Sequence, residues 1–532
     1  MSGEISKTRK RNTKQKERKH NKEHNKKLPF FQRPIVGFYI AIILWVIFVL
    51  LTVININFRT QSNIQFNTLF LLTEKSLFIF VALLAYGILT NTVIPGFLKD
   101  NKLLFLSSFI LVSTVGLTSF IIYISDALNF PPNLYIFYLP FGMATFLGTM
   151  FHSKKLGIML GLWMSFIISL LAKDSANSTF VFAMGMICSA VASELALHVK
   201  SRSKLISISV KVGVAQLICV PIIYSINIIS FEPLFMIKQA IACLGGSLIS
   251  AAATIILAPI IEKIFNITSD ITLFELSDLS HPVLQRLAMK APGTYHHSLV
   301  VANLAQAAAE AIGANPLAAR VCSYYHDIGK LTKPEFFSEN IPLNESPHDN
   351  LLPSMSTLIV TSHVKEGISR AISHNLPQII KDVILQHHGT SLVTFFHHKA
   401  KKQLELELES NTSKATEISE VDFRYPGPKP ISKEAVIISL ADSIEAASRS
   451  IEKPNKNSFQ NLINKIVTSR LEDGQLNNTD LTFAELNKIK QSFAFSLSNI
   501  MHGRIAYPDD DDNNNKQPDK SKNQKSTTET TS

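Results

Sequence analysis

Cysteine is scarce in this sequence, whereas long runs without charge are common. Only 4 of the 532 residues are Cys, and their spacing fits neither a disulfide framework nor a cysteine-based zinc site. Hydrophobic residues make up 46% of the chain, and the mean hydropathy is +0.18, which is high for a soluble protein. The chain is long enough for two or three domains, and we expect a large part of it to lie in a membrane.

Both ends of the chain lack the apolar residues that a core needs. The first 33 residues hold twelve Lys or Arg, so we expect a disordered basic cytoplasmic tail at 1–33 that fixes topology and contacts anionic lipid. Residues 509–532 are polar and are also predicted to be disordered. Because the net charge of +11 is so unevenly spread, it is no evidence for a nucleic-acid partner. No signal-peptide cleavage site follows the basic tail.

Residues 34–264 are predicted to form a transmembrane helical bundle. Its apolar runs each approach the roughly 20 residues that cross a bilayer, although the fourth and fifth are short. The eight expected spans are 35–55, 76–97, 103–125, 134–151, 156–172, 179–198, 205–229 and 238–262.

Basic residues alternate between the loops of this bundle. Lys99 and Lys102 follow the second run and Lys154 and Lys155 follow the fourth, whereas the loops between carry little Lys or Arg. This positive-inside pattern predicts an even number of spans in the inner (plasma) membrane, with both termini and the second half of the chain in the cytoplasm. The lipid bilayer is therefore an expected partner.

Ionisable residues are rare inside the expected spans. Glu194 and Lys211 are the notable ones, and both lie toward the cytoplasmic side. A charge in a span can mark function, but we favour a pair whose long side chains reach the interface. A transporter would usually carry more charges or broken helices near the midplane.

Residues 265–508 have helical periodicity and no run of strands, so the whole chain is predicted to be all-α. Ser269 to Leu276 predicts a capped amphipathic linker helix that could transmit movement from the last span. The segment 397–420 is predicted to be an exposed arm between helices. Further helices are expected at 299–312, 317–325, 363–374, 377–388 and 434–450.

The adjacent pair His326-Asp327 is the centre of a candidate metal site. Imidazole and carboxylate suit iron, manganese, zinc and similar divalent ions, and one Asp can bridge two of them. Such a pair of metals assists phosphoester hydrolysis. We expect Asp327 to be the bridge, and Lys330 to neutralise charge on a phosphate. The expected terminal ligands are His297, His326 and Asp442 for one metal and His363, His387 and His388 for the other. His296 is predicted to point away from the site, because adjacent helical residues diverge.

These residues lie in short sequence motifs. In this order, the motifs resemble those of the HD-domain phosphodiesterases of the seven-transmembrane HD receptor family of the PgpH type. The resemblance is close over about 265–508 and general over the membrane half. The matching motifs are Ala291–Ser298 (APGTYHHS), Tyr325–Lys330 (YHDIGK), Ser362–Val364 (SHV), Gln386–Thr390 (QHHGT), Phe423–Pro430 (FRYPGPKP), Leu440–Ala447 (LADSIEAA) and Arg470–Leu476 (RLEDGQL).

The resemblance implies an HD-fold helical domain with a two-metal site, usually of iron or manganese. It implies hydrolysis of cyclic di-AMP to linear 5′-pApA, and it places the metal ligands on the seven His and Asp residues given above, with Lys330 on a phosphate. One departure stands out. Family members usually carry a large extracellular domain between the first two spans, whereas here that gap is short, at about 56–75. A homodimer is suggested by the input of one linker helix into an HD domain.

Two other readings stay open. One is a different HD hydrolase, acting on cyclic di-GMP or a nucleotide. The HD-GYP signature would place Gly-Tyr-Pro shortly after the His doublet, but Gly389-Thr390 follows it here. The other is a membrane receptor whose HD domain only binds nucleotide, although the intact set of candidate ligands favours catalysis.

Overall fold

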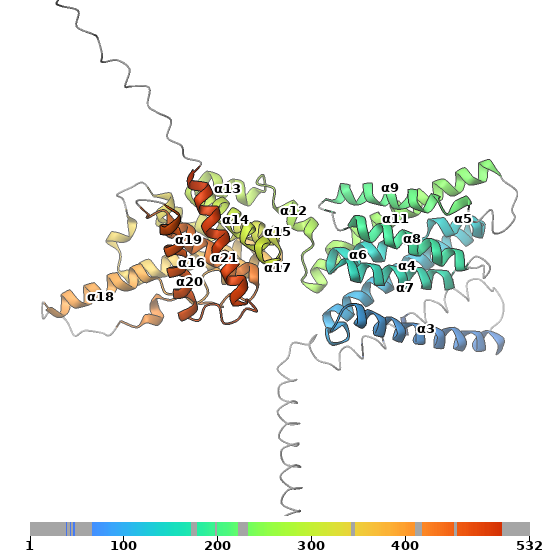
Figure 1. Ribbon diagram of the computed structural model, residues 1–532, viewed down its shortest axis with the longest axis horizontal. Helices are drawn as coiled ribbons and strands as arrows, with labels where there is room; N and C mark the ends of the chain where they lie inside the picture. Colours follow the sequence, from blue (N-terminus) through green and yellow to red (C-terminus); the bar gives the residue numbers. More distant parts are fainter. Residues whose placement is uncertain are drawn as a thin grey trace, which may run out of the picture.

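The computed structural model describes residues 66–502, except 172–177, 197–198, 200, 222–231, 342–345, 410–417 and 452–454, together with Tyr39, Ile43, Val46 and Ile47. The expected terminal tails lie outside the described residues, and so does most of the first expected span. In the described part, helices form two groups that α11 and α12 connect (Figure 1). There is no β-strand in that part, only an isolated bridge between Leu392 and Arg424. The all-α prediction is confirmed.

The first group contains the apolar helices. Four described helices are long and apolar enough to cross a membrane, namely α4, α7, α8 and α11. The elements of this group are α3 (Phe66–Val93), η2 (Phe97–Lys99), α4 (Asn101–Ala127), α5 (Pro132–Tyr135), η3 (Ile136–Tyr138), α6 (Met143–Phe151), α7 (Lys154–Leu171), α8 (Ser178–Ala196), α9 (Arg202–Leu217) and α11 (Pro233–Phe265).

Several described helices agree with the expected spans, but three differ. The seventh expected span, 205–229, is represented by α9, which ends at Leu217. The second begins about ten residues early, because α3 starts at Phe66, and this helix takes up half of the short gap expected at 56–75. The fourth is not one helix: it divides into α5, η3 and α6. The break has a local cause, because Leu139 is extended and Pro140 follows it, which disfavours the helical conformation at the preceding residue.

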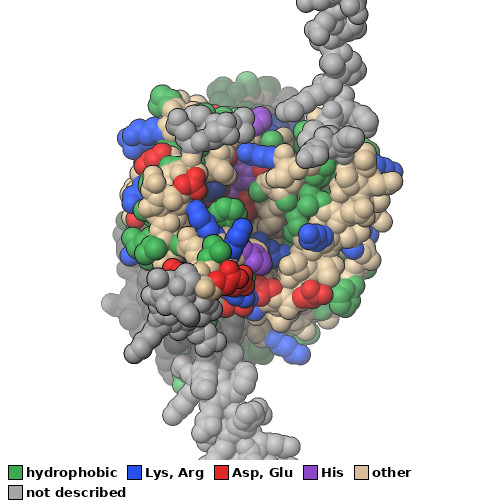
Figure 2. Space-filling model, turned by 90° about the vertical axis from the view of Figure 1, so that its left-hand side faces the viewer, with side chains coloured by type: hydrophobic (Ala, Val, Ile, Leu, Met, Phe, Trp, Pro, Cys, Tyr) green, Lys and Arg blue, Asp and Glu red, His purple; other side chains and the backbone are tan. Residues whose placement is uncertain are grey.

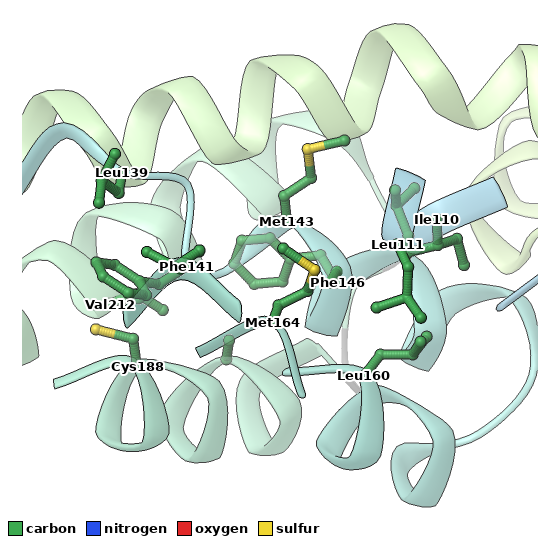
Figure 3. Packing of buried hydrophobic residues seen from close by; sticks show 14 of the residues in the cluster. Ile110, Leu111, Leu139, Phe141, Met143, Phe146, Leu160, Met164, Cys188 and Val212 are labelled. Atoms are coloured by element: carbon green, nitrogen blue, oxygen red, sulfur yellow. The ribbon is translucent and has the colours of Figure 1, made fainter. Parts of the chain in front are cut away.

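Large apolar side chains and close helix contacts hold this group together. Phe146, Leu160, Met164 and other buried side chains from α4, α6, α7 and α8 interdigitate in its core (Figure 3). A Cβ atom at Gly246 of α11 would lie 2.4 Å from the carbonyl oxygen of Phe137. Glycine there lets α11 lie against η3, so the broken fourth span packs into the bundle.

The two ionisable residues of the expected spans do not form a pair with each other. Glu194 of α8 forms an ion pair with Lys154 at the start of α7, while Lys211 is exposed on α9. Both ends of the Lys154–Glu194 pair are partly exposed, so the pair belongs to one rim of the helix group.

The linker helix is where the sequence predicts it. α12 (Asp270–Leu276) begins at Ser269, whose hydroxyl accepts a hydrogen bond from the backbone N–H of Thr272 and so caps the helix. Glu262 of α11 accepts hydrogen bonds from the Ser269 N–H and from the Thr272 hydroxyl, both at 2.8 Å. These contacts tie the linker to the end of the last apolar helix.

The second group packs around α14, α15 and α19. Gly313 takes a left-handed conformation, with φ of 72°, at the end of α14, as the sequence suggests. The elements of this group are α13 (Pro282–Lys290), α14 (Pro292–Ile312), α15 (Pro316–Tyr325), η5 (Ile328–Thr332), η6 (Pro334–Phe336), η7 (Ser338–Asn340), η8 (Pro347–Asn350), α16 (Pro353–Ser373), α17 (Gln378–Gln386), α18 (Thr394–Glu409), η9 (Glu420–Phe423), α19 (Lys433–Ser448), α20 (Lys456–Glu472) and α21 (Phe483–His502).

The expected exposed arm is largely a helix. α18 runs from Thr394 to Glu409, and residues 410–417 lie outside the described part. Phe396 and Ala400 on this helix are buried against Phe423. This apolar contact holds the segment, although its many charged residues favour an exposed arm.

Candidate metal centre

Five segments of the second group bring the candidate ligands to one place. Three of the side chains lie on helices, and four directly follow the end of a helix. His297 lies on α14, His326 and Asp327 follow α15, His363 lies on α16, His387 and His388 follow α17, and Asp442 lies on α19. All except His388 are buried.

Asp327 lies at the centre of the cluster. Its Oδ1 is 3.4 Å from Nε2 of His363 and 3.7 Å from Nε2 of His387. Its Oδ2 is 3.3 Å from Nε2 of His326 and 3.8 Å from Nε2 of His297. One carboxylate therefore faces two sets of imidazoles, one with each oxygen.

The donor atoms fall into two groups that share this carboxylate. Within each group the atoms lie within 4.8 Å of one another, close enough to hold a metal ion: Asp327, His363, His387 and His388 in one, and His297, His326 and Asp327 in the other. Asp442 touches both. Its Oδ1 is 3.0 Å from Nε2 of His297, and its Oδ2 is 3.6 Å from Nδ1 of His388.

Backbone carbonyls orient three of the imidazoles. Nδ1 of His326 donates to the oxygen of Ser323 at 2.7 Å, Nδ1 of His363 to Val360 at 2.6 Å, and Nδ1 of His387 to Ile384 at 2.9 Å. In a neutral imidazole the other nitrogen, Nε2, is then a lone-pair donor. In all three it points toward Asp327, which is the arrangement that metal-binding histidines adopt.

Two buried atoms of this cluster have no hydrogen-bond partner: Nε2 of His326 and Oδ1 of Asp327. Leaving such polar atoms unpaired is costly, and a cation bound at each of them removes that cost. Nitrogen and carboxylate oxygen donors suit divalent iron, manganese and zinc. The residues therefore fit a divalent metal, and the cluster could hold one or more such ions.

The protonation states also suit metal binding. Burial and the neighbouring His326 lower the pKa of His387 to about 3, and burial likewise lowers the pKa of His363 and His388. Burial alone would raise the pKa of Asp327, but His326 and Lys330 outweigh it and hold that pKa well below the usual range. The site thus combines neutral imidazoles with an ionised carboxylate.

His297 differs from the other imidazoles, because carboxylates contact both of its nitrogens. Burial lowers its pKa, but hydrogen bonds with Asp442 and Glu445 outweigh burial and raise the pKa to about 9. Arg449 holds the other oxygen of Glu445 at 2.7 Å. The sequence analysis assigned no role to Glu445. Its spacing of three residues from Asp442 was the available signal, because such residues share a helix face.

Lys330 is held between two carboxylates. Its Nζ lies 2.8 Å from Oδ2 of Asp327 and 2.7 Å from Oε1 of Glu339. Burial lowers its pKa, but Asp327 and Glu339 together raise it, so the side chain is a cation. Thr294 donates a hydrogen bond to the same Glu339 oxygen at 2.8 Å. No sequence signal pointed to Glu339.

An aromatic ring covers one side of the cluster. The ring of Tyr425 stacks on His388 with centroids 4.2 Å apart and an angle of 27°. On the face shown in Figure 2, His side chains lie in a hollow whose rim carries Lys, Arg, Asp and Glu. Among the imidazoles of the cluster, His388 is half-buried and the others are buried.

The structure brings all eight candidate residues together, and His296 is exposed outside the cluster. Gly329 is required by the packing of two backbone segments. A Cβ atom there would lie 1.8 Å from the carbonyl oxygen of His363. The absence of a side chain lets η5 lie directly on the backbone of α16, which sets the position of His363 relative to Asp327.

Comparisons with known proteins agree with this architecture. A family described as "7TM receptor with intracellular HD hydrolase" matches residues 69–269, and the HD domain family matches residues 294–447. The chain is 37% identical to the cyclic-di-AMP phosphodiesterase PgpH of Bacillus subtilis, over 70% of this chain and 51% of that protein. It is 36% identical to PgpH of Listeria monocytogenes, over 78% of this chain and 56% of that protein.

The chain therefore spans about half the length of the curated relatives it matches. A crystal structure of the L. monocytogenes PgpH HD domain in complex with cyclic-di-AMP is 43% identical, covers 42% of this chain and 99% of that chain, and superposes with a TM-score of 0.39. The apolar helices, the HD domain and the two matching families together show that this chain is a membrane protein belonging to the family of 7TM receptors with an intracellular HD hydrolase.

Proposed function

We propose that this chain is a membrane-bound, metal-dependent phosphodiesterase that hydrolyses cyclic di-AMP to linear 5′-pApA. The observation that carries the proposal is the position of Asp327, whose two oxygens face two separate groups of donor atoms. A site for two divalent ions bridged by one carboxylate is suited to phosphodiester hydrolysis. The substrate follows from the relatives, both of which are named cyclic-di-AMP phosphodiesterases.

The ligand assignment divides the cluster at Asp327. His297, His326 and Asp442 would hold one ion, and His363, His387 and His388 the other, with iron or manganese as the native metals. Metal ions held by these residues would supply Lewis acidity for phosphodiester hydrolysis. The imidazoles oriented by Ser323, Val360 and Ile384 already direct Nε2 toward Asp327, where an ion would bind.

Lys330 is the proposed phosphate contact. It is a cation beside Asp327, and a fixed charge beside the reacting phosphate stabilises the negative charge that develops there. In the described structure it is paired with Asp327 and Glu339. Binding of substrate would therefore exchange part of these contacts for a contact with the phosphate.

We further propose the placement of the chain in the cell. The basic tail at 1–33, the bundle at 34–264, the HD hydrolase domain at 265–508 and the tail at 509–532 would form one polypeptide in the inner (plasma) membrane, with both tails and the HD domain in the cytoplasm. The alternation of basic loops supports this orientation. A homodimer is the proposed assembly.

The test uses the full chain, purified in detergent without chelators and loaded with Mn²⁺ or anaerobic Fe²⁺. Cyclic di-AMP and cyclic di-GMP are offered separately, and products are separated by chromatography. We expect conversion of cyclic di-AMP to 5′-pApA, lost in Asp327→Asn. Preference for cyclic di-GMP would overturn the substrate. No turnover of either by the metal-loaded chain would instead indicate a receptor whose HD domain only binds nucleotide.

A further inference from the structure

A cavity of about 640 Å³ lies between the last apolar helix and the HD helices. One wall consists of the end of α11, the following loop and α12, including Lys263 and Glu275. The other consists of the end of α16 and the start of α17, including His374 and Lys381. Its volume is in the range of small-molecule sites. The proposed hydrolysis uses none of these residues.

Two lysines and two carboxylates line this cavity. Lys263 is exposed and Lys381 half-buried, and among the described residues neither forms an ion pair. Each of the two carboxylates has partners of its own. Glu262 accepts hydrogen bonds from Ser269 and Thr272, and Glu275 is paired with Arg202 at 2.9 Å. The cations that remain for a ligand are the two lysines, one on each wall.

The position of the cavity defines where an anion would come from. α11 has 33 residues, which corresponds to about 50 Å of helix, whereas the hydrocarbon core of a bilayer is about 30 Å thick. Lys263 lies in the last turn of α11 and so reaches the level of lipid headgroups. A phosphate group can arrive there on a lipid or on a soluble compound.

We propose that this cavity is a binding site for a phosphate-bearing anion, which Lys263 and Lys381 hold from opposite walls. The anion is either the headgroup of an anionic phospholipid or a soluble phosphate compound. In both cases it joins the end of the membrane bundle to the HD domain through a charge shared by two lysines.

The cavity is also in contact with the segment that carries the His-Asp pair. The ring of His281, which lines the cavity, lies 5.5 Å from the ring of Tyr325 and 6.5 Å from that of His374. The hydroxyl of Tyr325 donates to the carbonyl oxygen of Leu276 at 3.0 Å, and His326 is the next residue. An anion that draws the two walls together therefore restrains α12 against the start of the metal centre.

The test measures thermal unfolding of the full chain in lipid nanodiscs by circular dichroism, so it does not depend on catalysis. Three conditions are compared: phosphatidylcholine alone, phosphatidylcholine with phosphatidylglycerol, and phosphatidylcholine with inorganic phosphate in solution. We expect a ligand-dependent rise of about 3 °C in the unfolding midpoint. A rise with phosphatidylglycerol only identifies the lipid as the source, and a rise with inorganic phosphate only identifies a solute.

Variants distinguish anion binding in the cavity from a general attraction of the chain to anions. Lys263→Gln/Lys381→Gln should abolish the rise, and Lys263→Arg/Lys381→Arg should keep it. The matched control is Lys155→Gln/Lys204→Gln, because both residues are exposed at the starts of apolar helices, and this variant should respond like the wild type. The proposal is overturned if neither probe raises the midpoint of the wild type, or if the rise persists in the Lys263→Gln/Lys381→Gln variant.

Discussion

Nδ1 of His297 donates a hydrogen bond to Oε2 of Glu445, one helical turn from Asp442 on α19. Glu445 thereby fixes the orientation of His297, and Arg449 fixes Glu445 in turn. A carboxylate behind a metal-binding imidazole raises the basicity of that imidazole and holds its tautomer.

We expect Glu445→Gln to weaken metal binding about 10–100-fold while the fold persists, which is the usual cost of removing such a partner. Mn²⁺ titration of the full chain, followed by calorimetry, measures the affinity. Glu472→Gln is the matched control, because Glu472 is exposed on α20, and it should bind Mn²⁺ like the wild type. Unchanged affinity in Glu445→Gln would show that Glu445 does not support the site.

Metal stoichiometry distinguishes a bridging carboxylate from a terminal ligand. Because Asp327 faces both donor groups, Asp327→Asn should lower the bound metal by two ions per chain. His387 belongs to one group only, so His387→Asn should lower it by one. Mass spectrometry of the purified, dialysed variants measures the metal content. Equal losses in the two variants would contradict the division of the cluster at Asp327.

The stability of the metal-free chain should depend on pH in both directions. The pKa of His387 is about 3 in the fold and about 6.5 in an unfolded chain, so the unfolded state binds more protons as the pH falls below 6.5, and stability decreases toward pH 3. The pKa of His297 is raised to about 9, so its contribution is present below pH 6.5 and is lost as the pH rises through 9.

Denaturant unfolding of chelator-treated protein across this pH range checks the prediction. His387→Asn removes the group that resists protonation, so its stability should fall less steeply between pH 6.5 and 4 than that of the wild type. If the two curves have the same slope in that window, His387 is not held neutral by the fold.

Gly329→Ala should disturb both stability and the metal centre. The added Cβ would lie 1.8 Å from the His363 carbonyl oxygen, so η5 and α16 must separate. Overpacking of this kind costs about 1–3 kcal/mol or more. We expect a lower unfolding midpoint and weaker metal binding. Gly116→Ala is the control, because no atom lies within 4 Å of a Cβ there, and an unchanged midpoint in Gly329→Ala would contradict the close contact.

The sequence is informative where a pattern repeats or a residue has a chemical task. The linker helix follows from Ser269 and its cap, and the meeting of the candidate ligands follows from the donor types that divalent metals prefer. Helix ends are signalled locally as well, as Gly313 shows at the end of α14. These features depend on neighbours in sequence or on the chemistry of a ligand, both of which the sequence contains.

The features that sequence did not reveal depend on contacts between distant segments. Glu339 meets Lys330 only because η7 packs beside η5 and α14. Tyr425 stacks on His388 from a loop 37 positions away in the printed sequence. The apolar contact of α18 at Phe396 depends on Phe423, and its charged composition alone favours an exposed arm.

Tyr325→Phe should remove one contact between the linker helix and the segment that carries the metal centre, while the candidate metal ligands stay in place. It removes the hydrogen bond from the hydroxyl to the Leu276 oxygen, which is worth about 1 kcal/mol, and we expect a fall of about 2–4 °C in the unfolding midpoint. Metal content should not change, because His326 keeps its bond to Ser323. Tyr295→Phe is the control, since the Tyr295 hydroxyl has no hydrogen bond to any described residue. Loss of metal in Tyr325→Phe would mean that the linker contact helps to position His326.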